Sequence, residues 1–368
     1  MVNRIAILTS VMARGYGVSR VIHEQSLKLC KKNFEVDVFA TRYEKCAFGK
    51  EPYRIIRVPF VPFLLKTHIE RGNYDWVIAH TEPFFSMLPA LSEISRTVYY
   101  EHGVAPKVSE TGELTLESRL ISHRGKLANN VDGCVTVSKY IKNLLDLKDA
   151  AVIPNSGSHV LSAFSDKREN RLLYIGRLGK GEMGYKGLNE LLKIANACKD
   201  RFEIVMAVKG NDQLAQPFRE AGLKVHLNCS TDEISTLLKT SAVLLALSRY
   251  ESSDLPLLEA LASKTLPLAL SGGAHGEFGG KIFETSDKMI RFLRTTTFDE
   301  LLEFAQAESG TSSYTWEENT DLLVRFMRSI PQRKRGLKRA NNKVLQRAIE
   351  ALWSPFIMLH DIFRKLFR

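Results

Sequence analysis

The sequence predicts an α/β protein built from two doubly wound domains, and three observations lead to that prediction. Short apolar segments alternate with segments of helical periodicity, once before and once after a polar stretch at 155–170. Such alternation is typical of a parallel sheet covered by helices on both faces. The length of 368 residues suffices for two domains with full cores. A composition of 44% hydrophobic and 25% charged residues is that of a globular protein.

The elements follow one another in a regular order. In the first half, strands are expected at 5–9, 35–40, 54–58, 75–80, 97–101, 133–137 and 151–153. Helical patterns lie between them, at 18–33, 84–95, 115–130 and 138–146. The second half repeats the alternation, with strands expected at 171–176, 202–208, 224–228, 242–247 and 266–270. Ligands of doubly wound sheets bind beyond the carboxyl ends of the strands, so the two domains are expected to face each other across a cleft.

The most informative segment for function is 249–262, where Glu251 and Glu259 stand eight positions apart. The first lies in an expected loop and the second in the helix that this loop opens. Ser253 or Asp254 can cap the helix, and Pro256 falls in its first turn, where a missing N–H group does no harm. The start of a helix presents backbone N–H groups to a phosphate. Two carboxylates and a helix start would together suit a nucleotide sugar.

This spacing, followed by Ala-Leu-Ala at 260–262, resembles the signature of retaining glycosyltransferases of family 4, which have the GT-B fold of two Rossmann-like domains. Six further segments resemble the family in the same order, at 17–24, 74–80, 101–104, 132–140, 152–155 and 173–178 together with 185–187. The resemblance covers residues 1 to about 330. It implies an acceptor-side domain at 1–155, a linker at 156–170, a nucleotide-sugar-binding domain at 171–315, a helix at 316–330 that crosses back, and a basic tail at 331–368.

The resemblance also implies which residues bind the donor. Arg177 follows an expected strand and Lys186 precedes an expected helix, and both would hold the donor diphosphate. Two fixed cations can replace a metal there, because the developing charge is on phosphate oxygens. No metal or other cofactor is therefore expected.

Other roles follow from the same resemblance. Glu251 and His102 would be the catalytic residues, with Glu251 facing the transferred sugar and His102 contacting it, and Glu259 would bind the ribose. The remaining donor-binding residues would be Gly17, Ser253 and Leu255. Retention of configuration can use a nucleophilic carboxylate, as in glycosidases, or a front-face route in which the leaving phosphate helps to deprotonate the acceptor. The residues leave both routes open.

Two positions depart from the family pattern. Relatives often read Glu-Gly-Phe-Gly-Leu where this chain has Glu-Ser-Ser-Asp-Leu at 251–255, so Asp254 can either cap the helix or repel the diphosphate. Tyr16 stands where the family often has glycine, which would narrow the acceptor side. These departures leave a non-catalytic partner subunit as an alternative function. A nucleotide-sugar epimerase, which can share the fold, is a less favoured alternative.

Positive charge is concentrated at the C-terminus. Residues 328–368 hold eleven Lys or Arg against two acidic residues, so this segment carries +9 of the chain's net charge of +11. A polybasic stretch at 331–339 is followed by apolar residues at helical spacing, from Ile349 to Phe367. This pattern favours an interfacial helix on an anionic membrane. Packing on the protein's own surface is the alternative, and no nucleic-acid partner is expected.

The compartment is inferred from cysteines and from hydropathy. Five widely spaced cysteines favour a reducing environment. The chain enters a strand without a secretory signal, and no apolar run approaches the length that spans a bilayer. We therefore expect a cytoplasmic enzyme, peripheral on the inner face of the cell membrane. It would transfer a sugar from a UDP-sugar or GDP-sugar to a lipid-linked or polysaccharide-precursor acceptor of the cell envelope.

Overall fold

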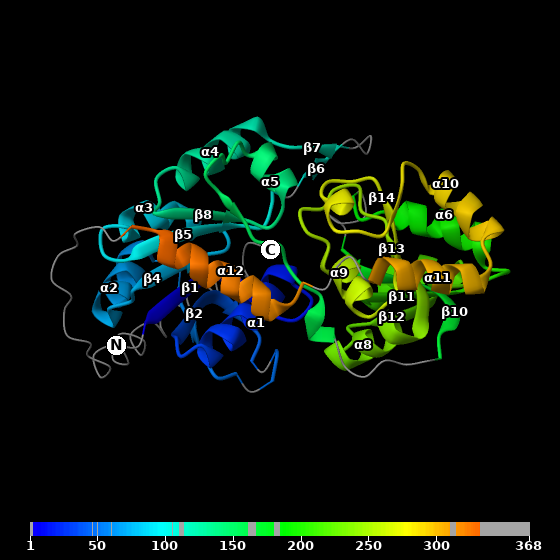
Figure 1. Cartoon of the computed structure of the whole chain (residues 1–368), viewed down its shortest axis with the longest axis horizontal. Coiled ribbons are helices and arrows are strands. Elements are labelled where there is room, and N and C mark those ends of the chain that lie inside the picture. Colours follow the sequence, from blue (N-terminus) through cyan, green and yellow to red (C-terminus); the bar gives the residue numbers. More distant parts are fainter. Residues whose placement is uncertain are drawn as a thin grey trace.

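The computed structural model describes residues 3–331 apart from 46, 50, 60, 105, 110–113, 161–166, 180–184 and 310–313. Two parallel sheets stand next to each other, each covered by its own helices (Figure 1). The predicted architecture of two doubly wound α/β units is thereby confirmed. The expected membrane-binding tail lies outside the described residues, except for Pro331.

The first sheet has seven parallel strands in the order β3-β2-β1-β4-β5-β8-β9. Alternate residues of the interior strand β1 belong to different cores, with Ile5 and Ile7 on one face and Ala6 and Leu8 on the other. The continuous apolar run is therefore explained by burial on both faces. The strands are β1 (Arg4–Met12), β2 (Glu35–Tyr43), β3 (Arg54–Arg57), β4 (Trp76–Ala79), β5 (Arg96–Glu101), β8 (Gly133–Thr136) and β9 (Ala151–Val152).

The helices of this half include one that the sequence pattern did not predict. Helix α2 has only four buried residues among eleven, which leaves a weak periodic signal. The short hairpin of β6 (Lys107–Val108) and β7 (Leu114–Thr115) was also not predicted, and the expected helix at 84–95 is divided into η1 and α3. The helices are α1 (Gly17–Lys31), α2 (Pro62–Gly72), η1 (Phe85–Met87), α3 (Leu88–Leu91), α4 (Ser118–Ala128) and α5 (Lys139–Leu144).

The second sheet has six parallel strands in the order β12-β11-β10-β13-β14-β15. The strands are β10 (Glu169–Arg177), β11 (Glu203–Lys209), β12 (Lys224–Leu227), β13 (Ser241–Ala246), β14 (Leu266–Leu270) and β15 (Lys281–Phe283). The last of these was not predicted and has three residues. The helices are α6 (Leu188–Cys198), α7 (Asp212–Glu220), α8 (Thr231–Thr240), α9 (Leu255–Ala262), η3 (His275–Glu277), α10 (Ser286–Thr295) and α11 (Phe298–Ser309).

The chain crosses between the halves twice. The first crossing contains the 3₁₀ turn η2 (Ser158–Val160) and leads into β10. The second leads into α12 (Trp316–Ser329), which returns and packs against α1 (Figure 1). Leu323 and Met327 of α12 join the core of the first sheet. Gln25 Nε2 donates to Asn319 Oδ1 at 2.8 Å, which pairs two buried polar side chains across the α1–α12 contact.

Candidate active site

A cleft of about 750 Å³ lies where the two halves meet. Its walls include the carboxyl ends of β1, β10, β11 and β13 and the start of α9, the places where ligands of such sheets bind. All eight residues proposed from the sequence line this one cleft: Gly17, His102, Arg177, Lys186, Glu251, Ser253, Leu255 and Glu259.

Lys186 is fixed against Glu251 by the local backbone. The next residue, Gly187, has φ 70°, and a Cβ there would lie 2.1 Å from the carbonyl oxygen of Leu247, so only glycine fits. The ammonium of Lys186 lies 2.5 Å from Oε1 of Glu251, and both side chains are mostly buried. Burial alone would lower the pKa of Lys186, but the carboxylate of Glu251 outweighs burial and raises that pKa. Lys186 is therefore a charged ammonium at neutral pH, paired with Glu251 in the cleft.

Arg177 ends β10 and lies over an aromatic ring from the other half. Its guanidinium carbon is 5.2 Å from the ring centre of Tyr16, the residue that stands where the family often has glycine. Lys209 and Arg42 approach the same ring at 5.1 and 5.5 Å. Cation–π attraction holds each of these charges near the ring. The ring of Tyr16 is therefore contacted by cations from both halves at the wall of the cleft.

The two halves also touch at the start of α9. A Cβ added to Gly17, the first residue of α1, would lie 3.3 Å from Cδ1 of Leu255, the first residue of α9. Ser253 does not cap α9; its Oγ accepts from Nδ2 of Asn155 at 3.0 Å. The starts of α1 and α9 therefore form one continuous wall.

Asp254 caps α9, with Oδ1 accepting the N–H of Leu257 at 3.3 Å. Its Oδ2 lies 2.9 Å from Nε2 of His275, whose Nδ1 lies 2.7 Å from the carbonyl oxygen of Leu270. A carbonyl can only accept, so Nδ1 carries a proton, and the contact with the carboxylate requires a second proton. The buried pair of Asp254 and His275 is therefore neutral as a unit.

The pKa shifts of this pair agree with its geometry. Burial would lower the pKa of His275, but the hydrogen bond to Asp254 outweighs burial and raises that pKa. Burial would raise the pKa of Asp254, but His275 holds that pKa below its ordinary value. The capping alternative for Asp254 is thus the one observed, with its charge balanced. No local sequence pattern pointed to His275, because it lies 21 positions away.

His102 follows β5 and belongs to a stack of rings. Its Nε2 lies 2.8 Å from Nδ1 of His80, and the rings of His80 and Tyr100 both stack on it. Burial lowers the pKa of His102 to about 3. The imidazole is therefore neutral at physiological pH and can offer a hydrogen bond but no charge. Ser252 Oγ donates to the carbonyl of His102, which fixes this strand end beside the loop of Glu251.

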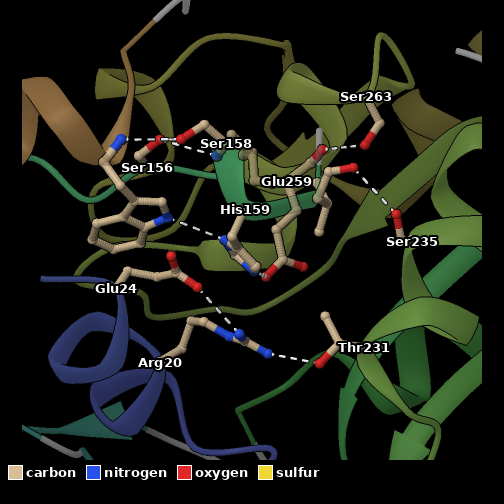
Figure 2. A network of polar contacts seen from close by, with 12 residues as sticks. Arg20, Glu24, Ser156, Ser158, His159, Thr231, Ser235, Glu259 and Ser263 are labelled. Atoms are coloured by element: carbon tan, nitrogen blue, oxygen red, sulfur yellow. Dashed lines mark hydrogen bonds and ion pairs between the residues drawn. The ribbon is translucent and has the colours of Figure 1, made fainter. Parts of the chain in front are cut away.

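Glu259 lies in a second polar network, shown in Figure 2. Its Oε1 is 3.0 Å from Nε2 of His159, whose Nδ1 accepts from the indole N–H of Trp316 at 3.1 Å. Below it, Arg20 of α1 contacts Thr231 of the second half at 2.8 Å. Neither His159 nor Trp316 was singled out from the sequence.

Within the part of the chain that the structure describes, neither a cluster of metal-binding side chains nor a membrane-spanning helix is present. No group of three or more His, Cys, Asp or Glu side chains there could hold a metal ion. No helix there is long and apolar enough to cross a membrane.

Two family models match the chain in consecutive segments. Residues 16–156 match the model described as Glycosyltransferase Family 4, and residues 162–278 match that described as Glycosyl transferases group 1. Together they cover 16–278 except for 157–161. A comparison with curated proteins found no match.

Solved structures share the fold at low identity. HepE of Anabaena, in complex with UDP and glucose, is 14% identical with a TM-score of 0.70, over 88% of this chain and 99% of that one. Sucrose-phosphate synthase of Thermosynechococcus elongatus is 15% identical with a TM-score of 0.69, over 89% and 98%. WaaG, a glycosyltransferase involved in lipopolysaccharide biosynthesis, is 13% identical with a TM-score of 0.64, over 88% and 100%. The chain is therefore a glycosyltransferase with the GT-B fold, and it belongs to the family 4-like, group 1 enzymes.

Proposed function

We propose that this glycosyltransferase takes its sugar from a nucleotide-sugar donor and transfers it with retention of configuration, without a metal ion. The observation that carries the proposal is the convergence of Arg177, Lys186 and Glu251 on one cleft at the start of α9. A diphosphate there would lie between two cations and the helix start, all of which favour negative charge. UDP and UDP-glucose in the structures of Anabaena HepE support a nucleotide diphosphate as the ligand of such a cleft.

The roles of the side chains follow from their chemistry. Arg177 and Lys186 stabilise the diphosphate as it leaves, because fixed cations act where the charge develops. Glu251 faces the sugar and the positive character of its anomeric carbon, with neutral His102 as a hydrogen-bonding partner of the sugar. Glu259 accepts hydrogen bonds from the ribose. Gly17, Ser253 and Leu255 shape the wall around the phosphates.

The contact between Lys186 and Glu251 favours the front-face route. An ammonium 2.5 Å from Oε1 stabilises the carboxylate, which makes it a weaker nucleophile. The leaving phosphate, held by Arg177 and Lys186, is then the base that takes the acceptor's proton. Glu251 stabilises the developing cation without forming a covalent bond.

The acceptor is proposed to be a lipid-linked or polysaccharide precursor of the cell envelope. The basic, amphipathic character of residues 331–368 supports a protein that works at the inner face of an anionic membrane. The resemblance in fold to WaaG, described as acting in lipopolysaccharide biosynthesis, supports the same class of acceptor. The neutral pair of Asp254 and His275 weakens the argument for a non-catalytic subunit, because Asp254 does not present an unbalanced charge to the donor.

The test is incubation of the full chain with radiolabelled UDP-sugars and GDP-sugars, with and without membranes. Transfer to a membrane component, or slow hydrolysis of one donor, is the expected result. Formation of an epimer would identify an isomerase instead, and an unchanged donor would indicate a partner subunit. Lys186→Ala is expected to slow turnover by about 100-fold to 1000-fold, as the loss of one fixed group that stabilises developing charge does. Lys193→Ala is the matched control, because Lys193 lies on the following helix with half of its side chain exposed and pairs with Asp287 outside the cleft.

A further inference from the structure

The two crossings between the halves meet beside the second glutamate of the cleft. Ser156 Oγ donates to the carbonyl of Tyr314 at 2.6 Å, which ties the first crossing to the second. The backbone N–H of Trp316 donates to Ser158 Oγ at 3.0 Å, which ties them again two residues further along each crossing. Two hydrogen bonds therefore join the crossings beside Glu259.

The ring of His159 lies between an indole and a carboxylate (Figure 2). The Nε1–H group of Trp316 lies 3.1 Å from Nδ1, and Oε1 of Glu259 lies 3.0 Å from Nε2. An indole N–H can only donate, so Nδ1 is the unprotonated nitrogen. The ring proton is therefore on Nε2 and is donated to Glu259. Trp316 thereby fixes both the tautomer and the orientation of His159.

Glu259 is held by this ring at the edge of the cleft. Its side chain is 11% exposed and lines the cleft, and Figure 2 shows its second carboxylate oxygen directed away from the imidazole. The first crossing also packs closely against α9 at this point. A Cβ on Gly157 would lie 2.2 Å from the carbonyl group of Leu258, so the backbone of the crossing lies directly on the helix. The orientation of Glu259 therefore depends on where the crossings lie.

We propose that His159 and Trp316 are positioning residues of the donor site, which hold the carboxylate of Glu259 in the orientation that receives a pair of donor hydroxyl groups. This inference rests on the proposed function, in which Glu259 binds the ribose of the donor. It adds that the donor site is completed by the two crossings. Because Trp316 begins α12, which packs on α1, the ribose site is linked to the half of the molecule that does not bind the nucleotide.

The test measures the Kd of UDP and GDP, and kcat and KM with the donor that turns over, in the full chain. His159→Ala removes one hydrogen bond to a charged group, so Kd and KM are expected to rise about tenfold while kcat changes less than about twofold. His159→Gln retains an N–H donor and is expected to recover most of the affinity. Trp316→Phe keeps the buried ring and loses only its N–H, with an expected loss of about threefold. Melting temperatures of all variants report whether the fold is retained.

A double-mutant cycle separates positioning from general stability. In a Glu259→Ala background, His159→Ala is expected to cause no further loss of affinity, because its effect passes through Glu259. Equal losses in both backgrounds, or a Gln variant no better than the Ala variant, would overturn the positioning role alone. A folded wild-type chain that binds neither nucleotide would overturn the proposed function, and the positioning role with it.

Discussion

The buried pair of Asp254 and His275 gives the sharpest prediction about stability. His275 is fully buried and Asp254 is 6% exposed, and each ring nitrogen of His275 faces an acceptor. His275→Leu fills a similar volume but leaves the carboxylate of Asp254 buried without its proton donor. Removing one partner of a buried ion pair costs about 3–5 kcal/mol of unfolding free energy. At about 2–4 °C per kcal/mol for a unit of this size, the melting temperature is expected to fall by roughly 10 °C.

The matched control keeps the cap and removes the charge. Asparagine caps helices as well as aspartate does, so Asp254→Asn combined with His275→Leu retains the hydrogen bond to Leu257 without a buried carboxylate. Urea denaturation at pH 7 is expected to show the double variant recovering at least half of the stability that the single variant loses. If His275→Leu lies within about 1 kcal/mol of the wild type, or if the double variant is no better, the charge-balance argument is wrong.

Three further predictions concern the pH dependence of this pair, the turnover of the donor and the basic tail. The contribution of the pair to the free energy of unfolding is expected to be largest between about pH 4 and 6.5. The pKa of His275 is raised, so its contribution is lost as pH rises above the ordinary value of 6.5; the pKa of Asp254 is lowered, so its contribution is lost as pH falls below the ordinary value of 3.8. Urea denaturation of the wild type and of Asp254→Asn/His275→Leu at pH 5.5 and pH 9 checks this, and an equal difference in stability at both pH values would contradict it. Arg177→Ala is expected to slow donor turnover by about 100-fold to 1000-fold, whereas Arg219→Ala, on the exposed face of α7, is expected to leave it unchanged in the same radiolabel assay. A chain ending at Pro331 is expected to lose sedimentation with anionic vesicles, to which each basic residue would contribute about 1 kcal/mol; equal sedimentation would remove the membrane role of the tail.

The fold was predictable because its strands are buried on both faces. Runs such as Ile5–Leu8 and Val243–Leu245 are apolar without alternation, and helical segments separate them. Helix α2 was missed because only four of its eleven residues are buried, and β15 because it has only three residues. The hydrophobic pattern of a segment therefore predicts its secondary structure only where burial requires apolar residues along that segment.

The residues of the cleft were predictable for a different reason. Glu251 and Glu259 lie on one loop and the helix that it opens, and Arg177 and Lys186 lie at a strand end and before a helix, so the family resemblance could be traced through short segments of the chain. The supporting residues act through contacts between distant segments, and spacing gives no signal for these. His275 reaches back 21 positions to Asp254.

A second supporting contact also lies outside the reach of any local pattern. Trp316 reaches His159 across 157 positions, and that contact exists only because the two crossings run together. Whether Asp254 caps α9 or repels the donor diphosphate could likewise be decided only from the fold, because the fold brings His275 into contact with Asp254.

The central claim is that a nucleoside diphosphate lies between Arg177, Lys186 and the start of α9. A crystal structure of the protein with UDP or GDP bound tests it most directly. The account predicts phosphate oxygens within hydrogen-bonding distance of both cations, about 3 Å, with Glu259 against the ribose. A nucleotide bound at another surface, or with its phosphates directed away from Arg177 and Lys186, would contradict it.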